Sequence, residues 1–146
     1  MGQGNRHEQQ IANLLFTYAE MVDAADFDGV AELFARGAYG MPGALVEGRA
    51  IGGVMRSAVV LHDGAMRTKH ITSNLLVELA EDARTATCRS YFTVMQATDT
   101  LPLQPILTGR YADRLARDDE GWYFVERLIT MEQLGDVSQH LRRPAG

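Results

Sequence analysis

The hydrophobic positions in the first half of the chain follow a helical period. Between residues 11 and 25, apolar side chains recur every three or four positions, and a second apolar stripe flanks the first. Tyr18 falls in the middle of this apolar surface and Asp23 at its edge, so both side chains are predicted to face inward. Such a position is unusual for a carboxylate.

Two further helices are predicted before the middle of the chain. Asp26 is a suitable N-cap for a short helix over residues 27–35, and apolar periodicity predicts a third helix over residues 49–62. Between them, a loop rich in Gly and Pro surrounds a short predicted strand at residues 38–41.

From residue 66 onward the pattern becomes that of strands. Segments rich in β-branched and aromatic residues, separated by short polar turns, occupy residues 66–79, 84–98, 106–117 and 121–134. Consecutive strands joined by short turns favour an antiparallel meander. Helices followed by a meander predict an α+β fold, with the helices packed on one face of a curved, mainly antiparallel sheet.

The last of these strands carries apolar residues at both parities. Straight alternation places Trp122, Phe124 and Leu128 on one face, and Tyr123, Val125, Ile129 and Met131 on the other. Each apolar face of the sheet must be shielded from water by another part of the protein or by a second subunit. The helices shield one face, and a second subunit is the natural candidate for the other, which predicts a homodimer or higher homo-oligomer.

Composition narrows the class of protein. The 146 residues are 46% hydrophobic and suit a single domain over residues 1–146, with flexible tails expected at 1–8 and 137–146. A net charge of −5 supplies no basic field, so neither nucleic acid nor a membrane surface is an expected partner. The single cysteine, Cys88, excludes an internal disulfide and shares the apolar parity of its strand, which favours a cytoplasmic protein and a core thiol.

His70 is the residue best suited to proton transfer near neutral pH. On straight alternation it shares its strand face with Thr72 and Asn74, as the wall of a polar-lined pocket would. A catalytic histidine needs a partner that fixes its tautomer, and Asp23 could supply it if the first helix packs on the sheet. Spacing alone favours a simpler alternative: a histidine bonded to a backbone carbonyl, and an aspartate that caps its own helix.

Other polar residues each allow two interpretations. Tyr18 could donate a hydrogen bond to a substrate oxygen, or be a core aromatic with a satisfied hydroxyl. Arg127 lies in an apolar stripe and requires an acidic partner, so a structural salt bridge is simpler than substrate binding. His62, Asp63 and His70 lack the spacing of a metal site, and no glycine-rich phosphate loop is present, so neither metal nor cofactor is expected.

Four stretches, taken in order, resemble a known family. They are IANLLFTYAEMVD at 11–23, DFDGVAELF at 26–34, HITSN at 70–74 and GRYADRLARDDEGWYFVER at 109–127. Together they resemble the SnoaL-like branch of the nuclear transport factor 2-like superfamily over nearly the whole chain. The resemblance implies a cystatin-like fold in which helices and sheet enclose a cone-shaped pocket.

Within that branch the chain is similar to scytalone dehydratases, bile acid 7α-dehydratases and lindane dehydrochlorinases. These enzymes build an elimination site from an aspartate at the end of the first helix and a histidine on the first long strand. The resemblance therefore favours Asp23 and His70 as a functional pair, matches Tyr18 to the inward tyrosine of the dehydratases, and matches Asn74 to a supporting pocket residue.

One departure from that pattern concerns the next strand. Some of these dehydratases carry a further acid or histidine there, whereas residues 89–93 read RSYFT. Tyr91 and Thr93 could donate hydrogen bonds instead, and with Asn74 and Arg127 they form the predicted substrate-binding set.

The resulting expectation is a cofactor-independent lyase, most simply a dehydratase acting on a hydrophobic cyclic small molecule. His70 would be the base, Asp23 would orient it, and Tyr18 would polarise the carbonyl or leaving group. Alternatives are an isomerase or polyketide cyclase that uses the same pocket, or a non-catalytic binding protein related to the small subunit of ring-hydroxylating dioxygenases.

Overall fold

The structure, a computed structural model, describes residues 2–142 and has an α+β fold, as the sequence predicts. The helices are α1 (Gln3–Asp23), α2 (Phe27–Leu33) and α3 (Ala50–Ala58). The strands are β1 (Ala38–Met41), β2 (Ala44–Glu47), β3 (Thr68–Leu79), β4 (Thr85–Gln96), β5 (Gln104–Asp118) and β6 (Gly121–Leu134). They form one sheet in the order β2-β1-β6-β5-β4-β3, antiparallel except between β1 and β6. The meander of β3 to β6 is thus confirmed, whereas β2 lies in the segment predicted as a loop.

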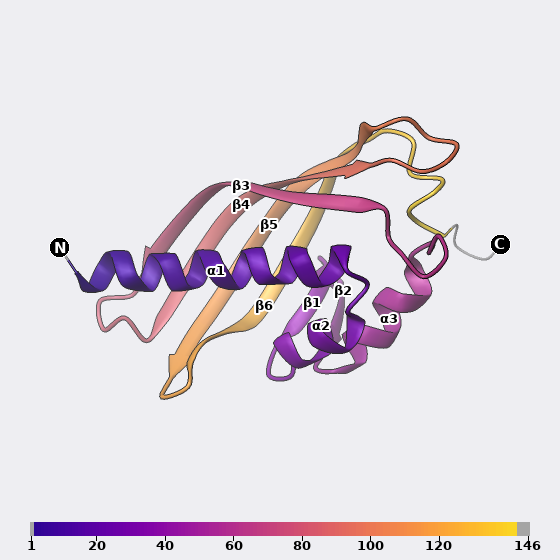
Figure 1. Cartoon of the computed structure of the whole chain (residues 1–146). Helices are drawn as coiled ribbons and strands as arrows, with labels where there is room; N and C mark the ends of the chain where they lie inside the picture. Colours follow the sequence, from indigo (N-terminus) through magenta and orange to yellow (C-terminus); the bar gives the residue numbers. More distant parts are fainter. Residues whose placement is uncertain (1, 143–146) are drawn as a thin grey trace.

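Helix α1 crosses one face of the curved sheet, and α2, α3 and the β1–β2 hairpin gather beyond its C-terminal end (Figure 1). The inward stripe of α1 is buried at Ile11, Leu15, Tyr18 and Val22, each no more than 3% exposed. Asp26 caps α2 as predicted, because its carboxylate accepts a hydrogen bond from the Gly29 amide. Much of the core therefore lies between α1 and the sheet. The end of the molecule that carries the β1–β2 hairpin is where a site can form.

Helix α1 begins eight residues before the predicted start at residue 11. Residues 3–8 carry no apolar period, so the sequence indicated a flexible tail over residues 1–8. That prediction is wrong for residues 3–8, since they continue the helix and the Trp122 indole donates a hydrogen bond to Nδ1 of His7. Residue 1 lies outside the described residues.

The other predicted tail, residues 137–146, is also ordered over its first part. Helix α3 ends at Ala58, four residues before its predicted end, because Val59 is extended and pairs with Leu141. The Val60 amide donates to the carbonyl of His140, and Arg142 donates through its amide to Ala58. Backbone pairing thus fixes the segment as far as residue 142, while residues 143–146 lie outside the described part.

Two β-bulges change which side chains share a face. In β3 the register shifts between Ser73 and Leu76, so Asn74, with a φ of 56°, points away from the face that carries His70. In β6, Leu115 opposes Phe124 while Arg114 opposes Glu126, which makes Val125 the extra residue. Straight alternation fails beyond each bulge.

The β6 bulge changes which apolar residues of that strand share a face. Phe124 and Arg127 are both fully buried on the helix side, and Ile129 and Met131 follow them there. The outer face still carries Ile71, Leu76 and Tyr91, which are about half exposed. Coverage of this face by a second copy stays a prediction.

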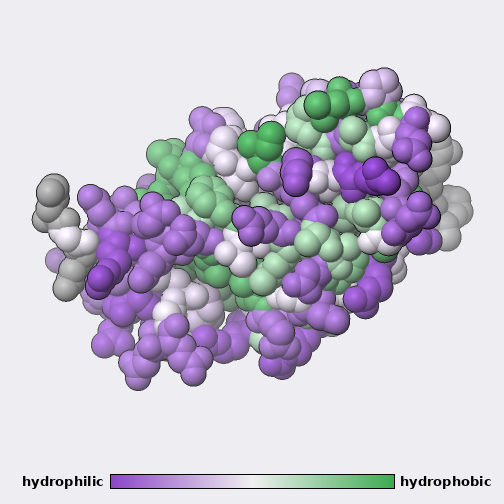
Figure 2. Space-filling view, in the orientation of Figure 1, coloured by the Kyte–Doolittle hydropathy of each residue, from purple (hydrophilic) through white to green (hydrophobic). Residues whose placement is uncertain are grey.

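Hydrophilic side chains surround the N-terminal half of α1, and hydrophobic surface gathers along the middle of the face drawn in Figure 2. No helix in residues 2–142 combines the length and the apolar character needed to span a bilayer.

Candidate active site

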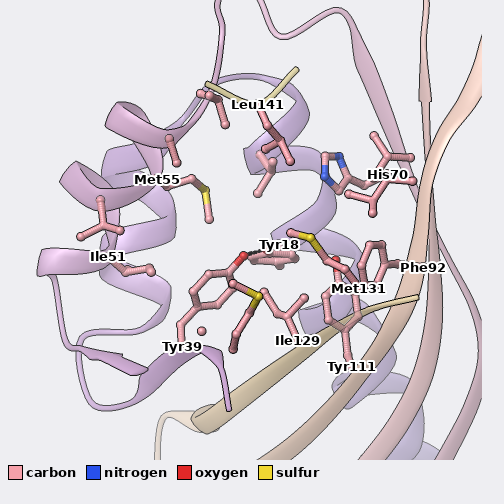
Figure 3. A pocket seen from close by; sticks show the side chains of 18 of the residues that line it. Tyr18, Tyr39, Ile51, Met55, His70, Phe92, Tyr111, Ile129, Met131 and Leu141 are labelled. Carbon is pink, nitrogen blue, oxygen red and sulfur yellow. Dashed lines mark hydrogen bonds between the residues drawn. The ribbon is translucent and has the colours of Figure 1, made fainter. Parts of the chain in front are cut away.

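A cavity of about 260 Å³ lies between the C-terminal half of α1, helix α3, the β1–β2 hairpin and the sheet. In Figure 3, His70 and Phe92 stand on the sheet side, opposite Ile51 and Met55 of α3, and Leu141 lies over one end. The apolar lining includes Val22, Ile51, Met55, Phe92, Val94, Ile129 and Met131. Tyr18, Tyr39, Tyr111, His70 and His140 bring polar groups to it. An apolar cavity with a few convergent polar groups is typical of a small-molecule site.

The predicted contact between Asp23 and His70 is present in the structure. The carboxylate Oδ1 accepts from Nδ1 of His70 at 2.6 Å and from the Thr68 hydroxyl at 2.8 Å, and Oδ2 accepts from the His70 amide at 2.8 Å. A carboxylate is only an acceptor, so Nδ1 carries the proton, and in the neutral imidazole the lone pair is then on Nε2. The side chain of His70, 9% exposed, lines the cavity, which leaves a potential base at the wall of the pocket.

The local environment explains why this aspartate is ionised. Burial disfavours the charged form of Asp23, but the hydrogen bonds from His70 and Thr68 outweigh it and hold the pKa of the carboxyl below its ordinary value. Asp23 is also the last residue of α1, where the helix dipole disfavours an anion. Three donors from β3 offset that cost, and the contact fixes both the ring orientation and the packing of α1 on β3.

Three tyrosines meet on another part of the wall. The hydroxyls of Tyr18 and Tyr39 are hydrogen-bonded to each other, and the Tyr18 ring packs edge-on against Tyr111. Burial, as the main cause, raises the pKa of all three hydroxyls, so they are neutral donors. When two hydroxyls share one hydrogen bond, the accepting one keeps its own proton. That proton can be donated to a third oxygen, that of Tyr111 or that of a ligand.

Phe92 forms a flat part of the wall, and a glycine makes room for it. A Cβ built at Gly109 would lie 2.6 Å from Cζ of Phe92 and would also collide with the carbonyl oxygen of Thr130. Phe92 stacks on Tyr111, with ring centroids 4.5 Å apart. Gly109 thus lets two aromatic rings pack closely against the sheet.

Arg127 does not reach the cavity, which corrects its inclusion among the substrate-binding candidates. Its guanidinium is fully buried and binds Asp113 through two hydrogen bonds of 2.7 and 2.9 Å. It also stacks over the rings of Tyr111 and Tyr18, at 3.7 and 4.5 Å from their centroids. The structural salt bridge, the simpler of the two sequence interpretations, is the one observed.

The other predicted substrate-binding residues also lie away from the cavity. Asn74 and Tyr91 line a separate depression on the outer face of the sheet, and Thr93 points to that face because its neighbours Phe92 and Val94 point inward. The β3 bulge displaces Asn74, whereas Tyr91 and Thr93 simply have the outward parity of β4. None of the three contributes to the wall beside His70.

Three polar lining residues, Tyr39, Tyr111 and His140, were not among the predicted site residues, and Tyr39 and His140 were the hardest to find. Tyr39 lies in the predicted strand at residues 38–41, and its inward position depends on the parallel pairing of β1 with β6. His140 lies in the predicted tail and is only 4% exposed. Their one sequence signal was their residue type, since neither falls in a periodic pattern.

Cys88 is buried as predicted, at 1% exposure. Burial and the nearby charge of Asp113 raise the pKa of its thiol to about 12, so it is unreactive at neutral pH. Among residues 2–142, no three His, Cys, Asp or Glu side chains cluster as metal ligands would.

With this geometry in view, the chain can be placed among known proteins. Solved structures with the same fold include Rv3472 of Mycobacterium tuberculosis, described as a protein of unknown function, in a variant form. It is 26% identical, with a TM-score of 0.69 over 88% of this chain and 73% of the other. No functionally curated protein matches the sequence significantly.

Two proteins of Novosphingobium aromaticivorans show the same fold at lower identity. One is a nuclear transport factor 2-like protein with a cystatin-like fold, 20% identical with a TM-score of 0.73 over 92% of this chain and 87% of the other. The second, provisionally named a scytalone dehydratase, is 21% identical with a TM-score of 0.73 over 91% and 89%. Residues 6–128 match the SnoaL-like domain family. The chain belongs to the family of SnoaL-like domains and has a cystatin-like, nuclear transport factor 2-like fold.

Proposed function

We propose that this protein is a cofactor-independent lyase, a dehydratase acting on a small hydrophobic cyclic molecule. The observation that carries the proposal is the 2.6 Å contact between Asp23 and Nδ1 of His70, which leaves the other ring nitrogen as a base at the wall of an apolar cavity. A binding protein would not require an oriented base there. The cavity volume of about 260 Å³ suits a compact molecule of one or two rings.

The proposed reaction needs no redox step. Nε2 of His70 takes a proton from the carbon next to a carbonyl, and the electron pair of that C–H bond forms the new C=C bond. The C–O bond on the adjacent carbon breaks with its electron pair, and the departing oxygen takes up a proton to leave as water. The imidazolium at His70 can return the proton, and Asp23 stabilises that cation.

The tyrosine pair supplies the complementary electrostatic role. In the transition state, negative charge develops on the carbonyl oxygen, and a neutral hydroxyl can donate to it without losing its own proton. Tyr18 is buried, Tyr39 is partly buried, and their hydroxyls are bonded to each other, so the donating hydroxyl needs little reorganisation. This role extends the one expected for Tyr18 from the sequence.

The base can be tested without knowing the natural substrate. β-Tetralone, a bicyclic ketone with acidic protons beside its carbonyl, is incubated with the protein in D₂O, and proton NMR follows the loss of those protons. The wild-type protein is expected to accelerate exchange. His70→Ala should reduce the accelerated rate by roughly 10²- to 10⁴-fold, the range for removal of a general base.

His7→Ala is the matched control, because His7 lies on the Trp122 side of α1 and outside the cavity. Exchange that survives His70→Ala in a folded protein would refute the proposal. A bicyclic β-hydroxy ketone then separates the reaction classes: loss of water gives a conjugated ketone with a new near-ultraviolet absorption, whereas an isomerase yields only a rearranged product.

A further inference from the structure

His140 is a second histidine of the cavity that the proposed mechanism does not use. Its ring lines the cavity beside His70, with the two ring centroids 6.0 Å apart and their planes inclined by 65°. The residue is 4% exposed, and its Nδ1 is buried without a hydrogen-bond partner among the described residues. A buried polar atom left unpaired costs about 1–3 kcal/mol, so its position calls for an explanation.

The chain around His140 is held firmly in place. The Gln139 carbonyl accepts from the side chains of Gln96 and His62, and the His140 carbonyl accepts from the Val60 amide. Arg142 donates through its side chain to the carbonyl of Val59. Hydrogen bonds on both sides of His140 fix the backbone that carries its imidazole beside the cavity.

The charge state of the ring follows from this position. Burial, together with the neighbouring His70, lowers the pKa of His140 to about 4, so the imidazole is neutral at physiological pH. A neutral imidazole has one N–H donor and one lone pair. It can therefore bind a carbonyl or hydroxyl oxygen without competing with His70 for a proton.

We propose that His140 contacts the substrate, and that its imidazole binds an oxygen function of the ligand next to the carbon that His70 deprotonates. This inference rests on the proposed function and sharpens the substrate class. The ligand carries one oxygen at the histidine end of the cavity and the carbonyl oxygen at the tyrosine pair, and the rest of its surface is apolar. Hydrocarbon rings that lack such an oxygen would leave the imidazole unpaired and bind less well.

A matched pair of probes tests this contact. β-Tetralone carries one oxygen, and tetralin has the same two rings without it. His140→Phe is expected to weaken binding of β-tetralone about fivefold, the effect of one neutral hydrogen bond, and to leave the affinity for tetralin unchanged. His140→Gln, which keeps a donor and an acceptor, should restore most of the lost affinity. Calorimetric titration measures both affinities.

Leu141→Ala is the control, because Leu141 lines the same end of the cavity with an apolar side chain. This substitution should weaken the binding of β-tetralone and of tetralin to the same extent. A second measurement uses the wild-type protein alone. The ¹⁵N resonances of the His140 ring should shift when β-tetralone binds and should not shift when tetralin binds.

The inference would be overturned if His140→Phe weakened the binding of both probes equally, or of neither. It would also be overturned if the ¹⁵N resonances of the His140 ring did not shift at saturating β-tetralone. Failure of the wild-type protein to bind either probe would overturn it too. These results differ from those that test the proposed function, which fails if His70→Ala keeps the accelerated proton exchange. The two ideas therefore stand or fall by separate measurements.

Discussion

Two acid–base pairs lie on the side of the sheet that α1 covers (Figure 1), and they differ in what surrounds them. Arg127 and Asp113 lie where the side chains of both are fully buried, with aromatic rings over the guanidinium. His70 and Asp23 lie at the cavity, with side chains 9% and 13% exposed. One pair is sealed in the core, and the other presents a free ring nitrogen to a space that a ligand can enter.

The comparison shows that a buried ion pair is not by itself a catalytic feature. Burial disfavours the charged guanidinium, but the adjacent Asp113 carboxylate outweighs it and raises the pKa of Arg127 above its already high ordinary value, so this pair cannot exchange protons near neutral pH. A histidine can exchange protons near neutral pH, because its ordinary pKa lies close to that value. Function here depends on the residue type of the cation and on the cavity beside it.

Breaking the sealed pair should produce the largest effect. Asp113→Asn keeps the shape of the side chain but leaves the Arg127 charge buried without a counter-ion, which should lower the free energy of unfolding by about 3–5 kcal/mol. Urea denaturation measures the change. The double variant Asp113→Leu with Arg127→Met removes both charges and should recover most of the loss. A single variant as stable as wild type would contradict the role assigned to this pair.

Low pH should destabilise the folded protein because His140, at one end of the cavity, is buried in its neutral form. The pKa of His140 is about 4 in the folded protein and near its ordinary value of 6.5 when unfolded. The unfolded chain thus binds more protons between these values, and stability is lost as pH falls from about 6.5 to 4. The loss attributable to His140 is about 3 kcal/mol. Unfolding free energies across this range should fall less steeply in His140→Gln, and parallel curves would contradict the prediction.

Changing the partner of the base should impair chemistry more than stability. Asp23→Asn removes the charge that fixes the Nδ1–H tautomer of His70, so proton exchange on β-tetralone should slow by about 100-fold, equivalent to about 2.7 kcal/mol of activation free energy. Asp23→Glu, which keeps the charge, is the comparison variant. An unchanged rate in Asp23→Asn would show that His70 needs no carboxylate.

The smallest effect is expected on the outer face. Tyr91→Ala should leave the exchange rate within about twofold of wild type, because Tyr91 points away from the cavity and surface substitutions are usually tolerated. Its neighbour Phe92 lines the cavity, so Phe92→Ala should weaken binding of β-tetralone and tetralin alike. A large loss in Tyr91→Ala would mean that the outer face contributes to the site.

Local periodicity predicted much of this fold because it reports which side of a helix or strand is buried. The stripe of α1, the Asp26 cap and the four-strand meander all rest on such patterns. Bulges escaped prediction, since one extra residue inverts the parity of every residue beyond it, and this misplaced Asn74 and the apolar residues of β6.

The sequence by itself determined the fold class and, with a family resemblance, the pairing of Asp23 with His70. Only the tertiary structure decided that Arg127 is sealed against Asp113, that Tyr39 joins Tyr18, and that His140 reaches the cavity. The physical reason is distance along the chain. Periodicity records the local environment of each residue, whereas a site is assembled by long-range packing that brings β1, β3 and the residues after β6 to the same end of α1.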